Sequence, residues 1–217
     1  MAGAAPSISG RRSRGMLRTM RFVALGDSYT IGTSVAEAER WPNQLVAVLG
    51  SGPPPLELVA NLAVNGFTSA DVIELELPRL AALHPDVVSL LIGVNDLVQG
   101  VPPGTYRRNV GTILDELVRL VGPARVVAIT TPDYTVTPAG SDFGDPRANA
   151  GGIREANAIL SEVAGERDVA VVDIHDISLR AAVDRSLVAR DGLHPSGAQY
   201  RLWVERIALA FGRLTAP

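Results

Sequence analysis

The sequence predicts an α/β protein, a doubly wound domain built on one parallel sheet. Five short apolar segments alternate along the chain with five longer segments whose apolar residues follow helical spacing. The third apolar segment, Asp86–Ile92 (DVVSLLI), is apolar almost throughout. Such a pattern is typical of strands that are buried on both faces, as in parallel sheets. No internal repeat and no second domain are evident in the sequence.

Each predicted element is bounded by residues that end regular structure. We expect strands at Met20–Gly26, Leu56–Leu62, Asp86–Ile92, Arg125–Thr130 and Val169–Asp173. We expect helices at Trp41–Leu49, Ser69–Leu83, Tyr106–Val121, Ile153–Arg167 and Ser196–Phe211. Gly50 and the prolines after it end the first helix, and Pro78 should bend or split the second. The polar, Gly- and Pro-containing stretch Asp133–Ala148 is expected to be a loop.

Composition limits the classes of protein to which the chain can belong. Its 217 residues, 47% of them hydrophobic, suit one domain with a full core and are few for two. A net charge of -3 gives no electrostatic case for binding nucleic acid or an anionic membrane. The absence of cysteine excludes disulfides, thiolate chemistry and cysteine-based zinc sites. It also fits the cytoplasm, where we expect the protein, although secretion stays open.

Two features concern the termini and membranes. Residues 1–19 are rich in Gly, Ala, Ser and Arg, and we expect a disordered tail ahead of a catalytic domain at 20–217. The arginines resemble the start of an export signal, but the next apolar run is needed as the first strand. An upstream start codon, with Met16 or Met20 as the working start, is the other interpretation. No run of 18 apolar residues exists, so no membrane span is expected.

Ser28 is the first candidate for chemistry. Ligands of doubly wound sheets bind outside the carboxyl ends of the strands. Ser28 lies two residues past the first predicted strand, where its hydroxyl would project into that crevice beside a helix N-terminus. Amides at a helix N-terminus favour developing negative charge. The alternative is that Ser28 only caps the helix.

A histidine and a carboxylate near the end of the chain suit a serine nucleophile. His194 lies in a loop before the last predicted helix, and an imidazole accepts a serine proton near neutral pH. Asp191, three residues earlier, could turn back to the imidazole Nδ1–H, and Gly192 permits that turn. The alternative is that Asp191 caps a turn and His194 is exposed. Of the other histidines, His84 ends a helix, and His175 follows the fifth strand and is the competing base.

Acyl transfer also needs hydrogen-bond donors for an oxyanion. Asn95 follows the third predicted strand and could direct its side-chain amide into the crevice. Gly66 follows the second strand and could present its backbone N–H, because the lack of a Cβ allows close approach. With the N–H of Ser28 these make three donors. The alternatives are an Asx-turn or cap for Asn95 and a simple turn for Gly66.

Four sequence stretches together resemble the SGNH (GDSL-type) hydrolase family. They are GDSYT at Gly26–Thr30, NLAVNGFTSAD at Asn61–Asp71, GVND at Gly93–Asp96 and DGLHPS at Asp191–Ser196. They occur in the family's order and span nearly the whole chain from Arg21 onward. One departure is visible, since Tyr29 stands where the name-giving motif has leucine. This departure concerns the shape of the acyl pocket rather than catalysis.

The resemblance implies a fold and a role for each candidate residue. The fold would be a flavodoxin-like three-layer α/β/α sandwich with a five-stranded parallel sheet. Ser28 would be the nucleophile, His194 the base and Asp191 the group that orients it. The N–H groups of Ser28 and Gly66 and the Asn95 side chain would form the oxyanion hole. No metal or cofactor is needed for this chemistry.

We therefore expect a serine esterase that acts on a small-molecule ester through an acyl-enzyme. Family members act on simple esters, thioesters, lysophospholipids and acetylated sugars. Few aromatic residues lie near the expected crevice beyond Tyr29, Phe67 and Tyr134, so the sequence gives little sign of a stacking platform for a sugar. This favours short-acyl esters, with a carbohydrate O-acetyl esterase or a lysophospholipase/thioesterase as alternatives.

Two further hypotheses come from other classes of protein. A flavin- or nucleotide-binding module could cradle a phosphate on the amides of the loop Ser28–Ser34. A metal-dependent hydrolase could use histidine and carboxylate ligands drawn from Asp173, His175, Asp176, Asp191 and His194. The first hypothesis gives no role to Asn95.

Overall fold

A computed structural model of the chain describes residues 18–52 and 54–214. The expected disordered tail therefore lies almost wholly outside the described residues, as does Met16. The five predicted strands form one sheet in the order β2-β1-β3-β4-β5, and every neighbouring pair is parallel. This order is that of the flavodoxin-like sheet, which confirms the predicted fold class. The strands are β1 (Met20–Gly26), β2 (Leu56–Asn61), β3 (Val87–Leu91), β4 (Val126–Ile129) and β5 (Ala170–Val172).

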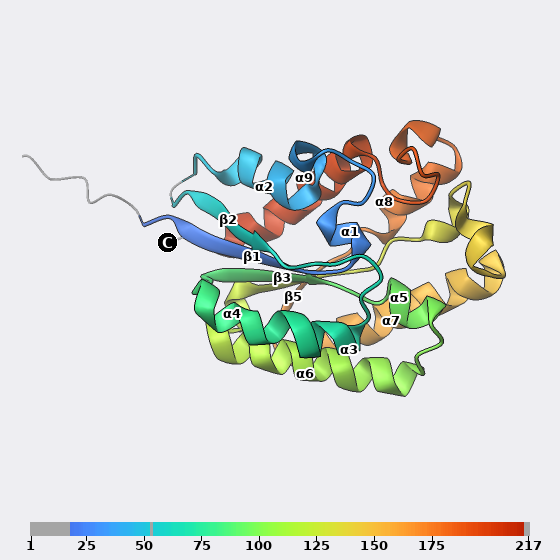
Figure 1. Cartoon of the computed structure of the whole chain (residues 1–217). Helices are drawn as coiled ribbons and strands as arrows, with labels where there is room; N and C mark the ends of the chain where they lie inside the picture. The colour runs from blue at the N-terminus through green and yellow to red at the C-terminus, as the bar shows by residue number, and fades with distance from the viewer. Residues whose placement is uncertain (1–17, 53, 215–217) are drawn as a thin grey trace, which may run out of the picture.

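Helices cover both faces of the sheet and so form three layers (Figure 1). One face carries α2 (Trp41–Leu49) and α9 (Gly197–Leu214), with the short α8 (His175–Leu179) beside them. The other face carries α3 (Ser69–Asp71), α4 (Leu77–Leu83), α6 (Pro103–Val121) and α7 (Pro146–Gly165). Two short helices, α1 (Ser28–Ile31) and α5 (Val94–Val98), directly follow β1 and β3. Both therefore lie at the carboxyl ends of the strands, where a ligand site is expected.

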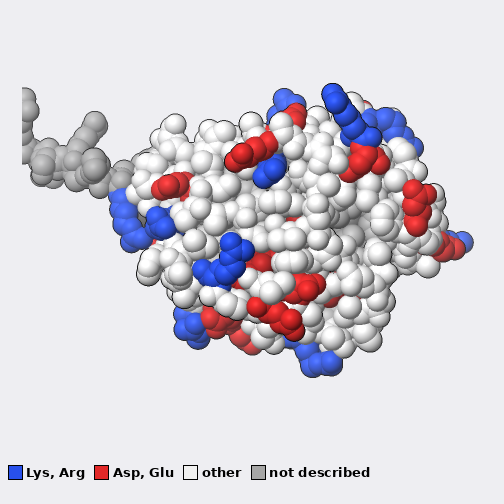
Figure 2. Space-filling model, in the orientation of Figure 1, with Lys and Arg blue, Asp and Glu red and all other residues white. Residues whose placement is uncertain are grey.

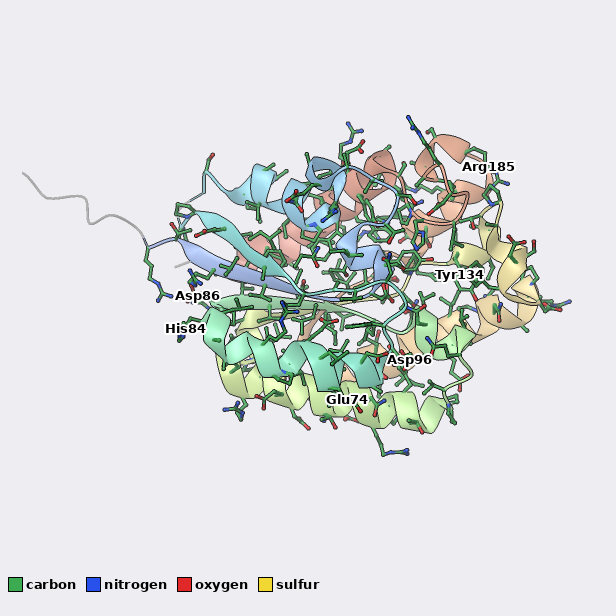
Figure 3. The ribbon with its side chains drawn as sticks, in the orientation of Figure 1. Glu74, His84, Asp86, Asp96, Tyr134 and Arg185 are labelled. Atoms are coloured by element: carbon green, nitrogen blue, oxygen red, sulfur yellow. The ribbon has the colours of Figure 1, made fainter. Side chains whose placement is uncertain are left out.

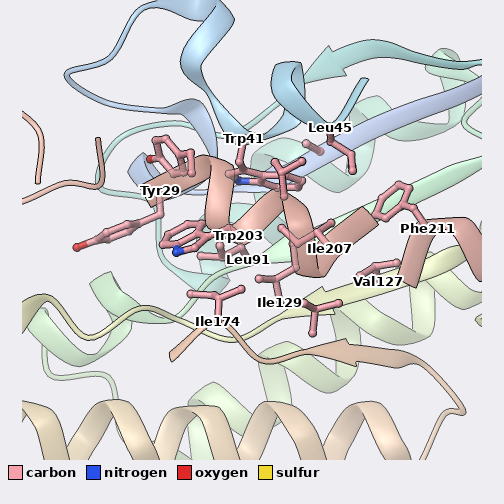
Figure 4. Close-up of a cluster of buried hydrophobic side chains, with 14 of the residues drawn as sticks. Tyr29, Trp41, Leu45, Leu91, Val127, Ile129, Ile174, Trp203, Ile207 and Phe211 are labelled. Atoms are coloured by element: carbon pink, nitrogen blue, oxygen red, sulfur yellow. The ribbon is translucent and has the colours of Figure 1, made fainter. Parts of the chain in front are cut away.

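Two apolar clusters, one on each face, hold these layers together. Between the sheet and α2 and α9 lie aromatic side chains that include Trp41, Trp203 and Phe211 (Figure 4). The Phe22 and Phe211 ring centroids lie 5.1 Å apart, edge to face. On the other face, β3 and β4 pack against a stripe of α6 that includes Val110, Ile113 and Leu117. All five residues of β3 are buried, which confirms the expectation from its nearly continuous apolar pattern.

Two helices differ from the sequence-based expectation. A π-helical turn, Val72–Glu76, separates α3 from α4, and Pro78 lies in the first turn of α4. Pro78 has no N–H to donate, so the helix changes type just before it, as a splitting proline would require. The predicted loop up to Ala148 is wrong at its end, because α7 begins at Pro146. The Asp145 carboxylate caps this helix by accepting the N–H groups of Arg147 and Ala148 at 2.7 and 3.0 Å.

The surface carries no segregated charge on the face shown in Figure 2. Acidic and basic side chains are interspersed over this face rather than gathered into one patch of either sign. Within residues 18–52 and 54–214, no helix combines the length and the apolar character needed to cross a bilayer.

Candidate active site

Ser28 is the first residue of α1, at the carboxyl end of β1, which lies between β2 and β3 in the sheet. The helix is capped by Asp27, whose Oδ1 accepts the N–H of Tyr29 at 2.9 Å, so the alternative that Ser28 is the cap is wrong. The chain reaches this turn through Gly26 at φ +145°, where a Cβ would lie 2.1 Å from the Leu91 carbonyl oxygen. Only glycine therefore fits between β1 and β3 at the point where the serine is presented.

The loop that carries His194 brings its imidazole to a carboxylate. Asp191 Oδ2 lies 2.7 Å from His194 Nδ1, and Asp191 Oδ1 accepts the backbone N–H groups of Leu193 and His194 at 2.9 and 3.0 Å. The carboxylate thus both caps the turn and faces the imidazole. Gly192 adopts φ +75°, the turn conformation expected of it. The ring of Tyr29 packs on the imidazole with centroids 5.1 Å apart.

A further hydrogen bond to Asp191 comes from a distant part of the chain. Ser34 Oγ donates to Asp191 Oδ2 at 2.6 Å across 157 positions of sequence. Partial burial alone would raise the pKa of Asp191, but the hydrogen bonds from Ser34, Leu193 and His194 outweigh it and hold the pKa at about 2. Asp191 is therefore ionised at neutral pH.

The oxyanion-hole candidates lie on two loops that are tied together. Asn95 Nδ2 donates to the Phe67 carbonyl at 2.9 Å, and Gln99 Nε2 donates to the Gly66 carbonyl at 3.1 Å. The Asn95 amide thus bonds across to another loop rather than capping its own helix, and one of its two N–H bonds stays available. Gly66 adopts φ +82°. Among the described residues, the N–H groups of Ser28 and Gly66 donate to no other protein group.

A buried polar network fixes this pair of loops from behind, and sequence reasoning missed it. The Asp96 carboxylate accepts hydrogen bonds from the backbone N–H of Ser69 at 2.9 Å and from its hydroxyl at 2.5 Å. Asn109 Nδ2 donates to Ser69 Oγ at 2.9 Å. Burial raises the pKa of Asp96, although the Ser69 hydrogen bonds act in the opposite direction. The network joins α5, α3 and α6. Its one sequence signal was the position of Asp96 next to Asn95.

Two more carboxyl groups are buried beneath Ser28, and nothing in the sequence pattern predicted them. Glu76, in the π-helical turn, accepts the Gly26 N–H with Oε2 at 3.0 Å. Burial raises the pKa of Glu76 to about 8, and the Asp27 charge adds to the rise while the Gly26 bond opposes it. Burial likewise raises the pKa of Asp27 to about 7. Both side chains are fully shielded from solvent, so each prefers its uncharged form.

We expect Glu76→Gln to stabilise the protein at neutral pH. An acid with a pKa of about 8 when folded and 4.5 when unfolded makes the unfolded state the better proton donor. The free energy of unfolding of the wild type therefore falls as pH rises from 4.5 to 8. The Glu76→Gln side chain cannot ionise, so the variant does not show this fall. The gain should be about 3 kcal/mol at pH 7 and near zero at pH 4.5. Urea unfolding at a series of pH values measures it.

The matched control is Glu74→Gln, an exposed carboxylate on the same turn (Figure 3). Its stability should follow that of the wild type at each pH. A Glu76→Gln gain that is equal at pH 5 and pH 8 would contradict the assignment of a buried neutral acid.

One cleft of about 210 Å³ brings together four of the five predicted site residues, and the fifth, Asp191, bonds to His194 from behind. Figure 3 places Tyr134 and Asp96 at this end of the sheet and His84 and Asp86 at the opposite end. The cleft is lined by Ser28, Tyr29, Thr33, Asn65, Gly66, Val94, Asn95, Val98, Tyr134, Phe143, Leu193 and His194. The serine, the imidazole and the oxyanion donors therefore face the same space.

The other candidates are not gathered there. The Nε2 atom of His175, the competing base, lies 3.6 Å from Asp133 Oδ2, and His175 is not among the residues that line the cleft. Asp176 pairs with Arg206, away from Asp191. Throughout the described part of the chain, no three His, Asp or Glu side chains lie close enough to hold a metal ion. The five ligands suggested for a metal-dependent hydrolase thus do not form a set.

The loop proposed to cradle a phosphate uses most of its amides internally. The N–H groups of Thr30 and Ile31 donate to the Asp27 carbonyl, and those of Gly32 and Thr33 donate to the Ser28 carbonyl. They are therefore not turned outward as a phosphate nest requires. The geometry gives no support to a flavin- or nucleotide-binding module.

The fold is a three-layer α/β/α sandwich whose cleft lies at the carboxyl ends of the strands. The GDSL-like lipase/acylhydrolase family model matches residues 24–202, and the chain belongs to this family. The protein is therefore a carboxylic ester hydrolase. None of the proteins with curated functions is similar enough in sequence to count as a match.

Solved structures share the fold. An α/β hydrolase enzyme from the metagenome of Lake Arreo is 21% identical with a TM-score of 0.71, covering 92% of this chain and 99% of that one. A variant of an acetyl xylan esterase from Geobacillus stearothermophilus is 19% identical with a TM-score of 0.69, covering 89% and 94%. A lipase/acylhydrolase from Enterococcus faecalis is 23% identical with a TM-score of 0.68, covering 88% and 94%.

Proposed function

We propose that the protein is a serine esterase that hydrolyses short-acyl esters through Ser28, His194 and Asp191. The observation that carries the proposal is the cleft, which Ser28, His194, Gly66 and Asn95 all line. The contact of 2.7 Å between Asp191 Oδ2 and His194 Nδ1 supports the order nucleophile, base and orienting acid. Membership of a lipase/acylhydrolase family supports the reaction class.

The mechanism follows from these positions. Ser28 Oγ attacks the ester carbonyl carbon while His194 Nε2 takes its proton, and ionised Asp191 stabilises the imidazolium that forms. The oxyanion accepts hydrogen bonds from the Ser28 N–H, the Gly66 N–H and the free Asn95 N–H. The carbonyl then reforms as the alcohol leaves with the proton of His194. Water, deprotonated by His194, attacks the acyl-enzyme in the same way and releases the carboxylic acid.

The lining of the cleft supports a short, uncharged acyl ester. It is mostly apolar, and Tyr29, Tyr134 and Phe143 are its three aromatic residues. A similar structure belongs to an acetyl xylan esterase variant, which keeps a carbohydrate O-acetyl esterase as the second proposal. Comparing kcat/KM for acetylated xylan with kcat/KM for p-nitrophenyl butanoate separates these two proposals, because only a carbohydrate O-acetyl esterase should prefer the xylan.

A serine-directed phosphonate tests the mechanism directly. A p-nitrophenyl alkylphosphonate should inactivate the enzyme stoichiometrically, because attack by Ser28 displaces p-nitrophenolate and leaves a tetrahedral adduct that resembles the intermediate. Peptide mass mapping should place the adduct on Ser28, and the ester substrate should protect. An enzyme that hydrolyses esters at full rate after phosphonate treatment, or an adduct on another serine, would contradict the proposal.

A further inference from the structure

The apolar side of the cleft is graded from buried to exposed. Val94 and Tyr134 are 6% and 2% exposed, whereas Val98 and Phe143 are 39% and 42% exposed. Val94 and Val98 are four positions apart on α5, so they lie on one face of that helix. The cleft therefore has an inner pair, Val94 and Tyr134, and a rim pair, Val98 and Phe143.

Phe143 is held in place rather than being a loosely attached surface residue. Its ring meets the Tyr134 ring edge-on with centroids 5.9 Å apart, and its carbonyl accepts the Asn149 side-chain N–H at 3.0 Å. The same segment is tied to the loop of the base, because the Ala139 N–H donates to the Gly192 carbonyl at 2.9 Å. Phe143 and Val98 thus give a ligand an apolar surface to cover at the rim of the cleft that Ser28 also lines.

The rest of the cleft lining includes polar side chains but carries no formal charge. Thr33 Oγ1 donates to Asn65 Oδ1 there, which joins the loop after α1 to the loop after β2. Among the described residues that line the cleft, none is Lys, Arg, Asp or Glu. Such a lining offers apolar contact and neutral hydrogen bonding, and no cationic side chain to pair with a phosphate.

We infer that Val98 and Phe143 determine acyl-chain specificity and that the substrates are uncharged esters of apolar acids. The inference rests on the proposed function, since it takes Ser28 as the point of attachment. The acyl chain would extend from Ser28 along the inner pair and reach the rim pair only when it is longer than acetyl. The alcohol would leave past Thr33 and Asn65.

The test is a series of p-nitrophenyl esters from acetyl to octanoyl with Phe143→Ala and Val98→Ala. Each methylene that loses apolar contact costs about fourfold in binding, so two methylenes cost more than about tenfold. We expect the hexanoyl-to-acetyl ratio of kcat/KM to fall about tenfold in Phe143→Ala and by less in Val98→Ala. Phe143→Leu, which keeps apolar contact, should lie between alanine and the wild type.

The control is Val183→Ala, which removes an exposed apolar side chain away from the cleft. Its ratio should equal that of the wild type. An unchanged ratio in Phe143→Ala, with the wild type and Val183→Ala both active, overturns the assignment of specificity. Ester hydrolysis by Ser28→Ala at the wild-type rate would instead refute the proposed function. The two failures are therefore distinguishable.

A second pair of substrates tests the requirement for an uncharged ester. We expect 1-hexanoylglycerol to be hydrolysed at least about tenfold faster than 1-hexanoylglycerol 3-phosphate, which would bring an unpaired phosphate to the cleft. Faster hydrolysis of the phosphate would overturn this part of the inference and favour a lysophospholipase.

Discussion

Ser28→Ala is expected to lower kcat for ester hydrolysis by about 10⁴-fold or more, with the fold intact. His194→Ala should be equally damaging, and the double variant scarcely worse than either, because the residues of a triad act as a unit. Asp191→Ala should lose less, because Asp191 orients the imidazole without itself exchanging a proton, and Pro195 still fixes the backbone just after His194. Steady-state kinetics on p-nitrophenyl butanoate, with circular dichroism of each variant, measures these effects.

The matched control for the base is His175→Ala. This histidine also faces a carboxylate, at 3.6 Å from Asp133 Oδ2, but does not line the cleft. Its kcat should stay within a small factor of the wild-type value. Near-normal kcat in Ser28→Ala refutes the mechanism, and a dead His175→Ala beside an active His194→Ala moves the role of base to His175.

Asn95→Ala is expected to lower kcat by about 10²- to 10³-fold with little change in KM. The free N–H of its amide would engage the oxyanion, which exists in the transition state and not in the bound ester. Asn95→Asp should be worse than alanine, because it places a negative charge beside the oxyanion. Kinetics over a range of ester concentrations separates kcat from KM.

Asn95 also donates to the Phe67 carbonyl, so a control for loop position is needed. Asn109→Ala removes a donor to Ser69 Oγ in the network behind the same loops without opening the cleft. Its loss in kcat should be far smaller than that of Asn95→Ala. If Asn95→Ala lowers only the melting temperature, Asn95 is a structural residue and the oxyanion hole has another donor.

The sheet was predictable because its strands are mostly apolar and are followed by turn-forming residues. The bounds predicted for β1 and α2, Met20–Gly26 and Trp41–Leu49, agree with the structure. The start of α7 was not predictable, since its first turns contain Asn149, Gly151 and Gly152, which disfavour helix in isolation. Tertiary contact decides there: a Cβ on Gly152 would lie 2.4 Å from Leu97, so the glycine lets α7 pack against α5.

The candidate site likewise has a part that the sequence predicts and a part that it does not. Ser28, Gly66 and Asn95 each follow a strand, so the topology of a parallel sheet alone brings them to one edge. The bond from Ser34 to Asp191 and the bond from Gly26 to Glu76 join residues 157 and 50 positions apart. Neither has a local sequence signal, because such contacts depend on how loops and helices pack after the sheet has formed.

The hydrogen bond between the Ala139 N–H and the Gly192 carbonyl has a consequence for protein engineering. It couples the segment that ends at Phe143 to the loop that carries His194, so the length of one constrains the position of the other. Libraries that alter the acyl range should therefore substitute side chains at the rim and keep the number of residues between Thr137 and Gly144 constant. An insertion there would displace the imidazole as well as the rim, and a gain in substrate range would come with a loss of turnover.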